Sequence, residues 1–141
     1  MKAIELNKTN VKDLKTILSS KKPVLILYHW SGCGHCITFM PVWKEMVEKF
    51  NKENVDCNCV SVEYSNIGLL PSAPKQYENN EEYMLTGVRA FPTIKMIKDK
   101  KIVDTFMDER KIDSLRTFVN KYVDKKPDTN KKPAKKKKTV K

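Results

Sequence analysis

The feature that most constrains this sequence is an apolar run that ends in a turn and is followed at once by a Cys-x-x-Cys motif. Val24 to Tyr28 is a continuous apolar segment, which is typical of a strand buried on both faces of its sheet. Trp30-Ser31-Gly32 predicts a turn, and Cys33-Gly34-His35-Cys36 then opens an amphipathic helix that runs to Phe50. A doubly buried strand needs helices on both sides of its sheet, so this segment predicts an α/β fold.

The helix that follows the motif has one apolar face. The residues expected to face the core recur every three to four positions and are Ile37, Met40, Trp43, Val47 and Phe50. Pro41 lies inside this helix and predicts a kink, because proline supplies no backbone N–H and crowds the preceding turn.

The rest of the chain continues the alternation of strands and helices. Strands are predicted at 3–6, 55–63, 93–97 and 101–106, and helices at 11–18, around 75–85 and at 112–122. Asp99-Lys100 predicts a tight turn between the last two strands. The resulting order βαβαβαββα predicts a central mixed β-sheet flanked by helices, in which crossover helices join parallel strands and a hairpin is antiparallel.

The two cysteines of the motif are placed for disulfide chemistry. Residues three apart in a helical turn have Cα atoms within the roughly 4.4–6.8 Å that a disulfide tolerates. Cys33 is predicted at the helix N-terminus, where free N–H groups and the helix dipole stabilise a thiolate, and Cys36 is predicted to be more buried. An exposed thiol that attacks and a shielded thiol that resolves predict a redox dithiol, and protonated His35 would add positive charge beside Cys33.

Two segments carry a resemblance to a known family. Val24–Phe50 resembles the active-site strand and helix of the thioredoxin superfamily, and Cys-Gly-His-Cys is the form of the motif found in protein disulfide isomerase domains. Pro41, five residues after Cys36, matches the helix proline of that family. Gly87-Val88-Arg89-Ala90-Phe91-Pro92-Thr93-Ile94 resembles the second signature of the family, whose proline is cis and faces the dithiol.

The resemblance spans roughly residues 3–124 and implies a thioredoxin-like fold with protein thiol–disulfide oxidoreductase activity of isomerase-like character. It implies that Phe91–Pro92 is a cis peptide whose backbone pairs with a substrate strand, so we expect substrate contacts at Trp30, Gly34, Phe91 and Pro92. The expected partners are protein thiols and disulfides, and neither a cofactor nor a metal is expected. The competing hypothesis is a redox-inactive peptide-binding module with the same fold.

Three positions depart from the family pattern. Leu27 stands six residues before Cys33, where the family keeps a buried acid, and Gly32 stands where a tryptophan usually precedes the motif. The stretch between Glu63 and Gly87 is also longer than the pattern needs. The first departure bears on proton transfer at the resolving cysteine and the second on substrate packing, and both favour the redox-inactive alternative.

A second pair of cysteines, Cys57 and Cys59, leaves three alternatives open. Together with the first pair it has a spacing close to that of a zinc ribbon, but the intervening residues predict a helix and the start of a strand, which makes zinc the weaker hypothesis. The preferred interpretation is that both are inert buried thiols, and a regulatory disulfide is the remaining one.

The positive charge of the chain is concentrated at its C-terminal end. Residues 125–141 hold nine lysines and one aspartate, a net charge of +8, which leaves +3 of the total +11 for residues 1–124. We therefore expect one domain over residues 1–124 and a disordered lysine-rich tail over 125–141. Such a tail predicts weak contacts with nucleic acids or other polyanions.

Two features of the sequence bear on location. The first eight residues lack the apolar region of a secretory signal, and the longest apolar run is far shorter than the roughly 20 residues that span a bilayer. We therefore expect a cytoplasmic monomer that does not enter the membrane. A Lys-, Asn- and Ile-rich composition is typical of AT-rich genomes such as those of some large DNA viruses, for which the virion is the alternative location.

Overall fold

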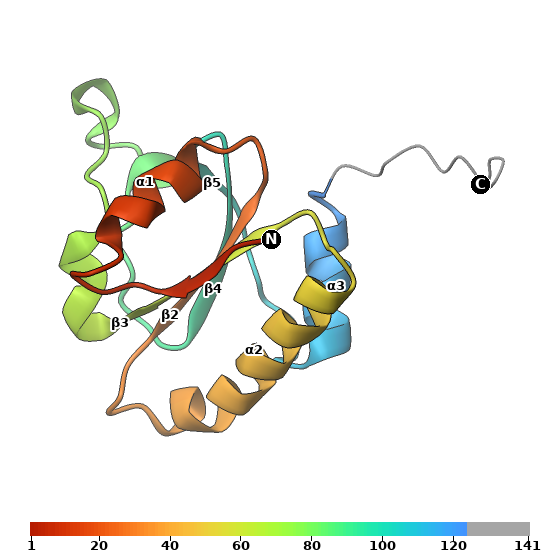
Figure 1. The fold of residues 1–141 in the computed structure, drawn as a ribbon. Helices are drawn as coiled ribbons and strands as arrows, with labels where there is room; N and C mark the ends of the chain where they lie inside the picture. The colour runs from red at the N-terminus through yellow and green to blue at the C-terminus, as the bar shows by residue number, and fades with distance from the viewer. Residues whose placement is uncertain (124–141) are drawn as a thin grey trace, which may run out of the picture.

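A five-stranded sheet lies between two layers of helices and loops in the computed structural model, which describes residues 1–123 (Figure 1). The predicted lysine-rich tail, 125–141, lies outside the described residues. The strands are β1 Ala3–Glu5, β2 Val24–His29, β3 Asn58–Glu63, β4 Thr93–Lys98 and β5 Lys101–Thr105. The α-helices are α1 Val11–Ser19, α2 Gly34–Lys52 and α3 Ile112–Asn120.

The sheet is mixed, with the strand order β1-β3-β2-β4-β5. β1, β3 and β2 are parallel, β4 runs antiparallel to β2, and β5 runs antiparallel to β4. Leu27 of β2 lies opposite Ser61 on one side and Ile94 on the other, which fixes the register of the three central strands. The carboxyl ends of the parallel strands therefore meet at one edge, and α2 begins there.

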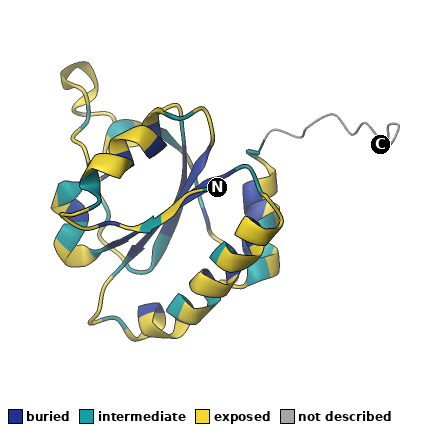
Figure 2. Ribbon diagram, viewed as in Figure 1, coloured by how far each residue is buried: buried dark blue, intermediate teal, exposed yellow. Residues whose placement is uncertain are grey.

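Each face of the sheet carries its own hydrophobic core. Leu25 and Leu27 of β2 pack toward α2 and α3, whereas Val24, Ile26 and Tyr28 pack toward α1 and the segment 64–88. All five side chains are buried, so the prediction of a strand buried on both faces is confirmed (Figure 2). Each such aliphatic side chain stabilises the fold by about 1.5–3 kcal/mol through burial.

The helix predicted around residues 75–85 does not form. The chain instead makes short 3₁₀ helices at Tyr64–Leu69, Lys75–Tyr77 and Glu81–Tyr83, so the observed order of strands and α-helices is βαβαβββα. Pro74 immediately precedes the second of them, and the Asn80 side chain caps the third by accepting a hydrogen bond from the Glu82 backbone N–H. A proline and a new cap within one expected helix divide it into single turns.

The buried face of α2 is also shifted from the predicted one. Ile37 is 63% exposed, and the side chains that face the sheet are Cys36, Phe39, Trp43, Met46 and Phe50. These positions alternate steps of three and four, so the prediction had the right period and the wrong starting residue. Cys36 facing the sheet matters for chemistry because it removes that thiol from solvent. Among residues 1–123, no helix is long and apolar enough to cross a membrane.

Candidate active site

Cys33 immediately precedes α2, at the point where the extended backbone changes to helix. It is the N-cap, and its sulfur accepts a hydrogen bond from the Cys36 backbone N–H at 3.2 Å. Cys33 is partly exposed and Cys36 is 1% exposed, and both are free thiols. Amide groups at the start of the helix therefore face the Cys33 sulfur, as a stabilised thiolate requires.

The two sulfurs have opposite acid–base properties. The pKa of Cys33 lies below its ordinary value, because the Cys36 thiol, the backbone N–H groups of Cys36 and His35, and the Arg110 guanidinium all favour its thiolate. Burial, followed by the hydrogen bond with Cys33, raises the pKa of Cys36 to about 11. At neutral pH the exposed sulfur is thus the better nucleophile and the buried one retains its proton.

The proline loop lies directly against Cys33. The Phe91–Pro92 peptide is cis, and the Cys33 thiol donates a hydrogen bond to the Phe91 carbonyl oxygen at 3.4 Å. Thr93, the first residue of β4, fixes the loop by donating from its hydroxyl to the Ala90 carbonyl oxygen at 2.7 Å. Because β4 pairs antiparallel with β2, its first residue lies at the same edge of the sheet as the end of β2.

Three aromatic rings form a row beside the dithiol. The ring centroids of Trp30 and Tyr64 are 6.0 Å apart, and those of Tyr64 and Phe91 are 5.7 Å apart, both in edge-to-face arrangements. Trp30 is 45% and Tyr64 56% exposed, so the row presents apolar surface to solvent. Trp30 and Phe91 were predicted at the site, but nothing in the sequence distinguished Tyr64, which the fold brings in from the start of the segment 64–88.

The glycine before Cys33 makes room for Trp30. A Cβ atom at Gly32 would lie 2.8 Å from the Trp30 indole, so the ring lies over the Gly32 backbone. Gly34 and His35 are exposed, and a Cβ at Gly34 would meet no other atom within 4 Å. The surface around Gly34 is therefore open to an approaching chain. His35 helps to lower the pKa of Cys33 through its backbone N–H and not through its imidazole.

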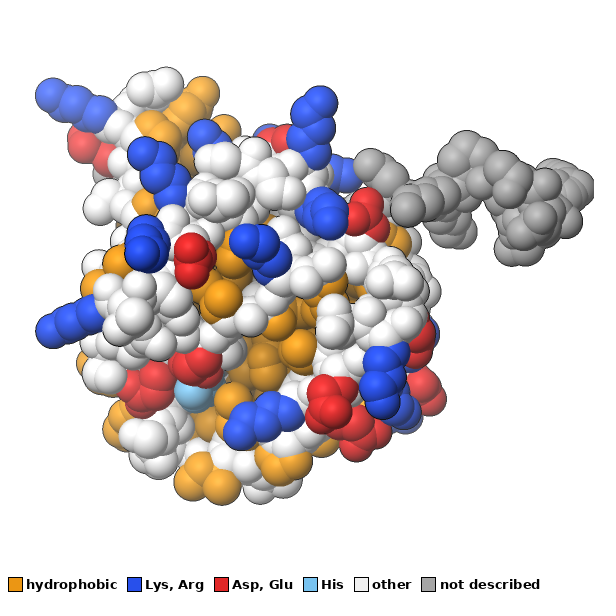
Figure 3. All heavy atoms as spheres, viewed as in Figure 1, with side chains coloured by type: hydrophobic (Ala, Val, Ile, Leu, Met, Phe, Trp, Pro, Cys, Tyr) orange, Lys and Arg blue, Asp and Glu red, His pale blue; other side chains and the backbone are white. Residues whose placement is uncertain are grey.

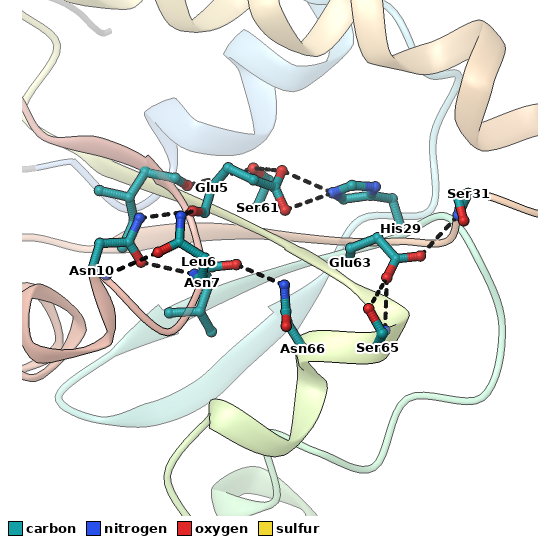
Figure 4. A network of polar contacts seen from close by, with 11 residues as sticks. Glu5, Leu6, Asn7, Asn10, His29, Ser31, Ser61, Glu63, Ser65 and Asn66 are labelled. Carbon is teal, nitrogen blue, oxygen red and sulfur yellow. Dashed lines mark hydrogen bonds and ion pairs between the residues drawn. The ribbon is translucent and has the colours of Figure 1, made fainter.

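A polar cluster lies at the carboxyl edge of the parallel strands (Figure 4). His29 Nε2 lies 2.9 and 3.1 Å from the two carboxylate oxygens of Glu5, and the Ser61 hydroxyl donates to the same carboxylate at 2.6 Å. Burial raises the pKa of Glu5, but these hydrogen bonds outweigh it and keep that pKa below its ordinary value. A carboxylate only accepts, so Nε2 carries the ring proton and faces Glu5.

A neighbouring carboxylate fixes the turn that leads into the motif. Glu63, at the end of β3, accepts hydrogen bonds from the backbone N–H of Ser31 and from Ser65. The hydrogen bonds from Ser65 and Ser31 lower the pKa of Glu63 to about 2, so the carboxylate stays charged at any physiological pH. The turn that positions Cys33 is thereby tied to β3, a link that sequence analysis missed because the partners are 32 residues apart.

Leu27 lies on the face of β2 that α2 and α3 cover. It is fully buried among the side chains of the α2–α3 core, and it carries no group that could accept a proton from Cys36. His29 is the next β2 residue on the same face, because side chains alternate along a strand.

The second cysteine pair lies at the opposite end of the sheet from the dithiol. Cys59 pairs with Leu25 at the start of β2, four residues before His29 and therefore about 13 Å from the edge where α2 begins. Cys57 and Cys59 are both buried in the α2–α3 core, and the contact with Cys57, together with burial, holds the pKa of Cys59 well above its ordinary value. This register rules out one zinc site shared by the four cysteines, and it agrees with inert thiols.

Comparison with known proteins bears on this geometry. The family model described as Thioredoxin matches residues 3–121, which is most of the chain. The chain belongs to the thioredoxin family. Its Cys33–Cys36 pair is a Cys-x-x-Cys motif that lies within the matched residues.

Relatives of two kinds match at similar identity. A thioredoxin of Rickettsia typhi is 28% identical over 83% of this chain and 97% of its own length. A protein disulfide-isomerase of Schizosaccharomyces pombe is 26% identical over 84% of this chain, but the chain spans only 29% of that protein. A second relative from Schizosaccharomyces pombe, whose name also includes protein disulfide-isomerase, is 24% identical, and this chain spans only 21% of its length.

Solved structures show the same fold. The first two thioredoxin domains of Eps1p from Naumovozyma dairenensis superpose with a TM-score of 0.59 at 19% identity, over 84% of this chain and 40% of that one. A mutant thioredoxin from Halobacterium salinarum gives a TM-score of 0.57 at 17% identity, over 89% and 93%. The thioredoxin-like fold predicted from the sequence, with a five-stranded mixed sheet flanked by helices, is thus confirmed.

Proposed function

We propose that this chain exchanges disulfides with protein substrates through Cys33 and Cys36 and has isomerase-like redox character. The observation that carries the proposal is the division between the two sulfurs. Cys33 is partly exposed at a helix N-terminus with a lowered pKa, and Cys36 is buried with a pKa raised to about 11. Such a pair has one sulfur that attacks from solvent and one that waits behind it.

The reaction runs in two balanced exchanges. The Cys33 thiolate attacks one sulfur of a substrate disulfide, the substrate S–S bond breaks, and the released substrate sulfur leaves as a thiolate that takes up a proton. Cys36 then loses its proton, attacks the Cys33 sulfur of the mixed disulfide and releases the second substrate sulfur. The substrate has gained two electrons and two protons, the protein holds a Cys33–Cys36 disulfide, and the reverse sequence oxidises a substrate dithiol.

The proline loop and the aromatic row support protein chains as substrates. The Phe91 carbonyl lies 3.4 Å from the Cys33 sulfur, so an extended chain that pairs with this loop would bring its own sulfur to Cys33. Trp30 and Tyr64 offer exposed rings to the flanking side chains, and Gly34 leaves the approach open.

The Cys-Gly-His-Cys motif supports an isomerase-like potential. A stabilised thiolate favours the reduced dithiol and makes the disulfide more oxidising, and Arg110 adds to that effect here. We therefore expect a reduction potential nearer to about −180 mV than to the roughly −270 mV of thioredoxins. Relatives named thioredoxin and relatives named protein disulfide-isomerase match at similar identity, so the reduction potential is the measurement that separates the two activities.

A redox-inactive peptide-binding module is the second candidate. Leu27 favours it, because an aliphatic side chain at that buried position cannot accept the proton of Cys36.

Trapping tests both candidates. Full-length Cys36→Ser should retain the attack and be unable to release its substrate, so disulfide-linked partners accumulate on non-reducing gels and disappear with reductant. Cys33→Ser is the matched control and should trap little. Wild-type protein should reduce insulin, and equilibration with glutathione should give the potential. Equal trapping by both variants, or an inert wild-type dithiol, would contradict the proposal.

A further inference from the structure

The segment 64–88 is fastened to the sheet face opposite α2 at several points. The Tyr28 hydroxyl, beneath the segment, donates a buried hydrogen bond to the Leu85 carbonyl oxygen at 2.9 Å. The Asn66 side chain donates to the Leu6 carbonyl oxygen at 3.1 Å, and Ile67 and Leu70 are buried in the same core. The segment is therefore a fixed wall that stands beside α1.

A pocket of about 480 Å³ lies between this wall and α1. Its volume falls in the range of small-molecule sites, about 300–1,000 Å³. The apolar residues that line it include Leu14 and Leu18 from α1, and Leu69, Pro71, Tyr83 and Leu85 from the wall. The pocket is thus an apolar cleft built by the stretch of chain that is longer than the family pattern needs.

The mouth of the pocket carries more positive than negative charge. Lys15 of α1 and Lys100 of the β4–β5 turn line it, with Asp99 as the acidic residue. Within residues 1–123, neither lysine has an ion pair or hydrogen bond from its ammonium group. In Figure 3, basic and acidic side chains both lie around the end of the molecule that carries α1, with apolar surface between them.

The turn between β4 and β5 holds Lys100 in a backbone conformation that lysine disfavours. Asp99 and Lys100 both have positive φ, 55° and 68°, although two-residue hairpin turns of this kind usually contain glycine. A lysine rarely adopts this conformation, and non-glycine residues held in it concentrate at functional sites. Here the turn places both residues at the pocket.

We propose that this pocket binds a small amphipathic carboxylate, an unbranched aliphatic chain with one carboxylate head. The aliphatic chain would lie among Leu14, Leu69 and Leu85, and the carboxylate would lie between Lys15 and Lys100. A neutral apolar ligand would leave both ammonium groups unpaired, and a cationic one would be repelled by two lysines and attracted by one aspartate. The site is on the sheet face opposite α2, so this binding does not depend on the redox chemistry.

Matched surfactant-like probes test the site in the full-length protein. Decanoate is titrated below its micelle concentration, with decyltrimethylammonium as a probe of equal chain length and opposite charge. Leucine methyl NMR should show saturable shifts at Leu14, Leu18, Leu69 and Leu85 with decanoate, and at least about tenfold weaker binding of the cation. A decanoate response that does not saturate, or that centres on the dithiol, would overturn the proposal, as would equal binding of the two probes.

Charge reversal at the mouth provides the matched variants. Lys15→Glu/Lys100→Glu should weaken decanoate binding by about tenfold or more and strengthen binding of the cation. Lys44→Glu/Lys52→Glu makes the same change on exposed positions of α2, outside the pocket, and should leave both affinities unchanged. All four positions are exposed, so folding is retained. Equal reductions in affinity in both double variants would mean that only net charge matters and would contradict the site.

Discussion

Cys33 is stabilised as a thiolate by groups from two distant parts of the chain. The Cys36 thiol and the N–H groups of Cys36 and His35 belong to the motif, whereas Arg110 comes from the loop between β5 and α3. Arg110 also favours the thiolate of Cys36, so one exposed guanidinium acts on both sulfurs. No local pattern in the sequence distinguishes this arginine from its neighbours.

Removal of that charge should slow Cys33. In Arg110→Met the pKa of Cys33 rises, so less thiolate is present at neutral pH and alkylation by iodoacetamide slows about two- to fivefold, as expected for one solvent-screened charge. The difference in alkylation rate should vanish at pH values above the Cys33 pKa of both proteins, where all Cys33 is thiolate. Rates measured across pH 5–10 give the profile. Lys111→Met removes the adjacent charge and should leave the profile in place; an equal shift there would show a nonspecific effect of net charge.

Position 27 carries a leucine and not an acid, so we can predict how the resolving step at Cys36 depends on pH. A pKa of about 11 for Cys36 means that resolution should accelerate as pH rises through the neutral range. Leu27→Glu introduces an acceptor beneath α2, with a pKa raised by burial toward neutrality, and should accelerate resolution near pH 7. Stopped-flow measurement of product release across pH 6–9 tests this, with Leu25→Glu, buried on the same face of β2, as the control that should not accelerate.

The same substitution has a stability cost with a defined pH dependence. We expect Leu27→Glu to lower the free energy of unfolding by about 1–3 kcal/mol. Its folded pKa is raised above the unfolded one, so the destabilisation is smallest at low pH and grows as pH rises from the unfolded value through the folded one. Chemical denaturation at acidic and alkaline pH measures it. Unchanged resolution in a folded variant would show that another group, such as His29 on the same face of β2, already accepts the proton.

At the scale of elements, the loop between β2 and α2 places Trp30 over the backbone of Gly32. The ring that lies beside Cys33 comes from Trp30, and Gly32 leaves the space it occupies. In Gly32→Ala the new Cβ would meet the indole at 2.8 Å, so the exposed ring must move. Because the ring is at the surface, the free energy of unfolding should change by less than about 1 kcal/mol, whereas kcat/KM for a protein disulfide should fall about threefold.

A double-mutant cycle isolates this packing of the indole on Gly32. In a Trp30→Ala background, Gly32→Ala should have no further effect on kcat/KM, because the clash is gone. Gly34→Ala is the matched glycine substitution on the other side of Cys33; its Cβ meets nothing within 4 Å, so the ring should not move. Additive reductions from Trp30→Ala and Gly32→Ala would show that the two positions act separately.

Elements with local signals could be predicted, and elements held by distant contacts could not. β2 and α2 are specified by an apolar run, a turn and spacings of three and four, all within 29 residues of chain. The segment 64–88 is held by contacts such as Tyr28 to Leu85, 57 residues apart, and Pro74 and the Asn80 cap divide the expected helix. Tyr64 and Arg110 joined the site for the same reason, since only the folded sheet brings them to Cys33.

At the scale of the whole molecule, the surfaces serve different chemistry. The dithiol lies at the carboxyl edge of the sheet where α2 begins, and the lysine-rimmed pocket lies on the face of α1. Most of the net charge of the chain lies outside both sites, because residues 125–141 carry +8 of the total +11. Charge-driven association and disulfide exchange should therefore be separable.

Deletion of residues 125–141 tests that separation. The truncated protein should reduce insulin at the wild-type rate and keep its melting temperature, because the dithiol and both cores lie within residues 1–123. Its binding to a short single-stranded oligonucleotide should fall at low ionic strength, and the dependence of log affinity on log salt should flatten by about 0.7 for each phosphate that the protein no longer neutralises. Fluorescence polarisation over a salt series measures the slope.

Two variants of residues 125–141 serve as controls. Replacing the nine lysines with glutamine keeps the length of the tail, and its oligonucleotide affinity should match that of the deletion. A scrambled tail of the same composition should bind like wild type, because screened charge does not depend on the order of the residues. Weaker binding of the scrambled protein would mean that the tail is recognised by its sequence, and a large fall in melting temperature on truncation would mean that it contributes to the fold.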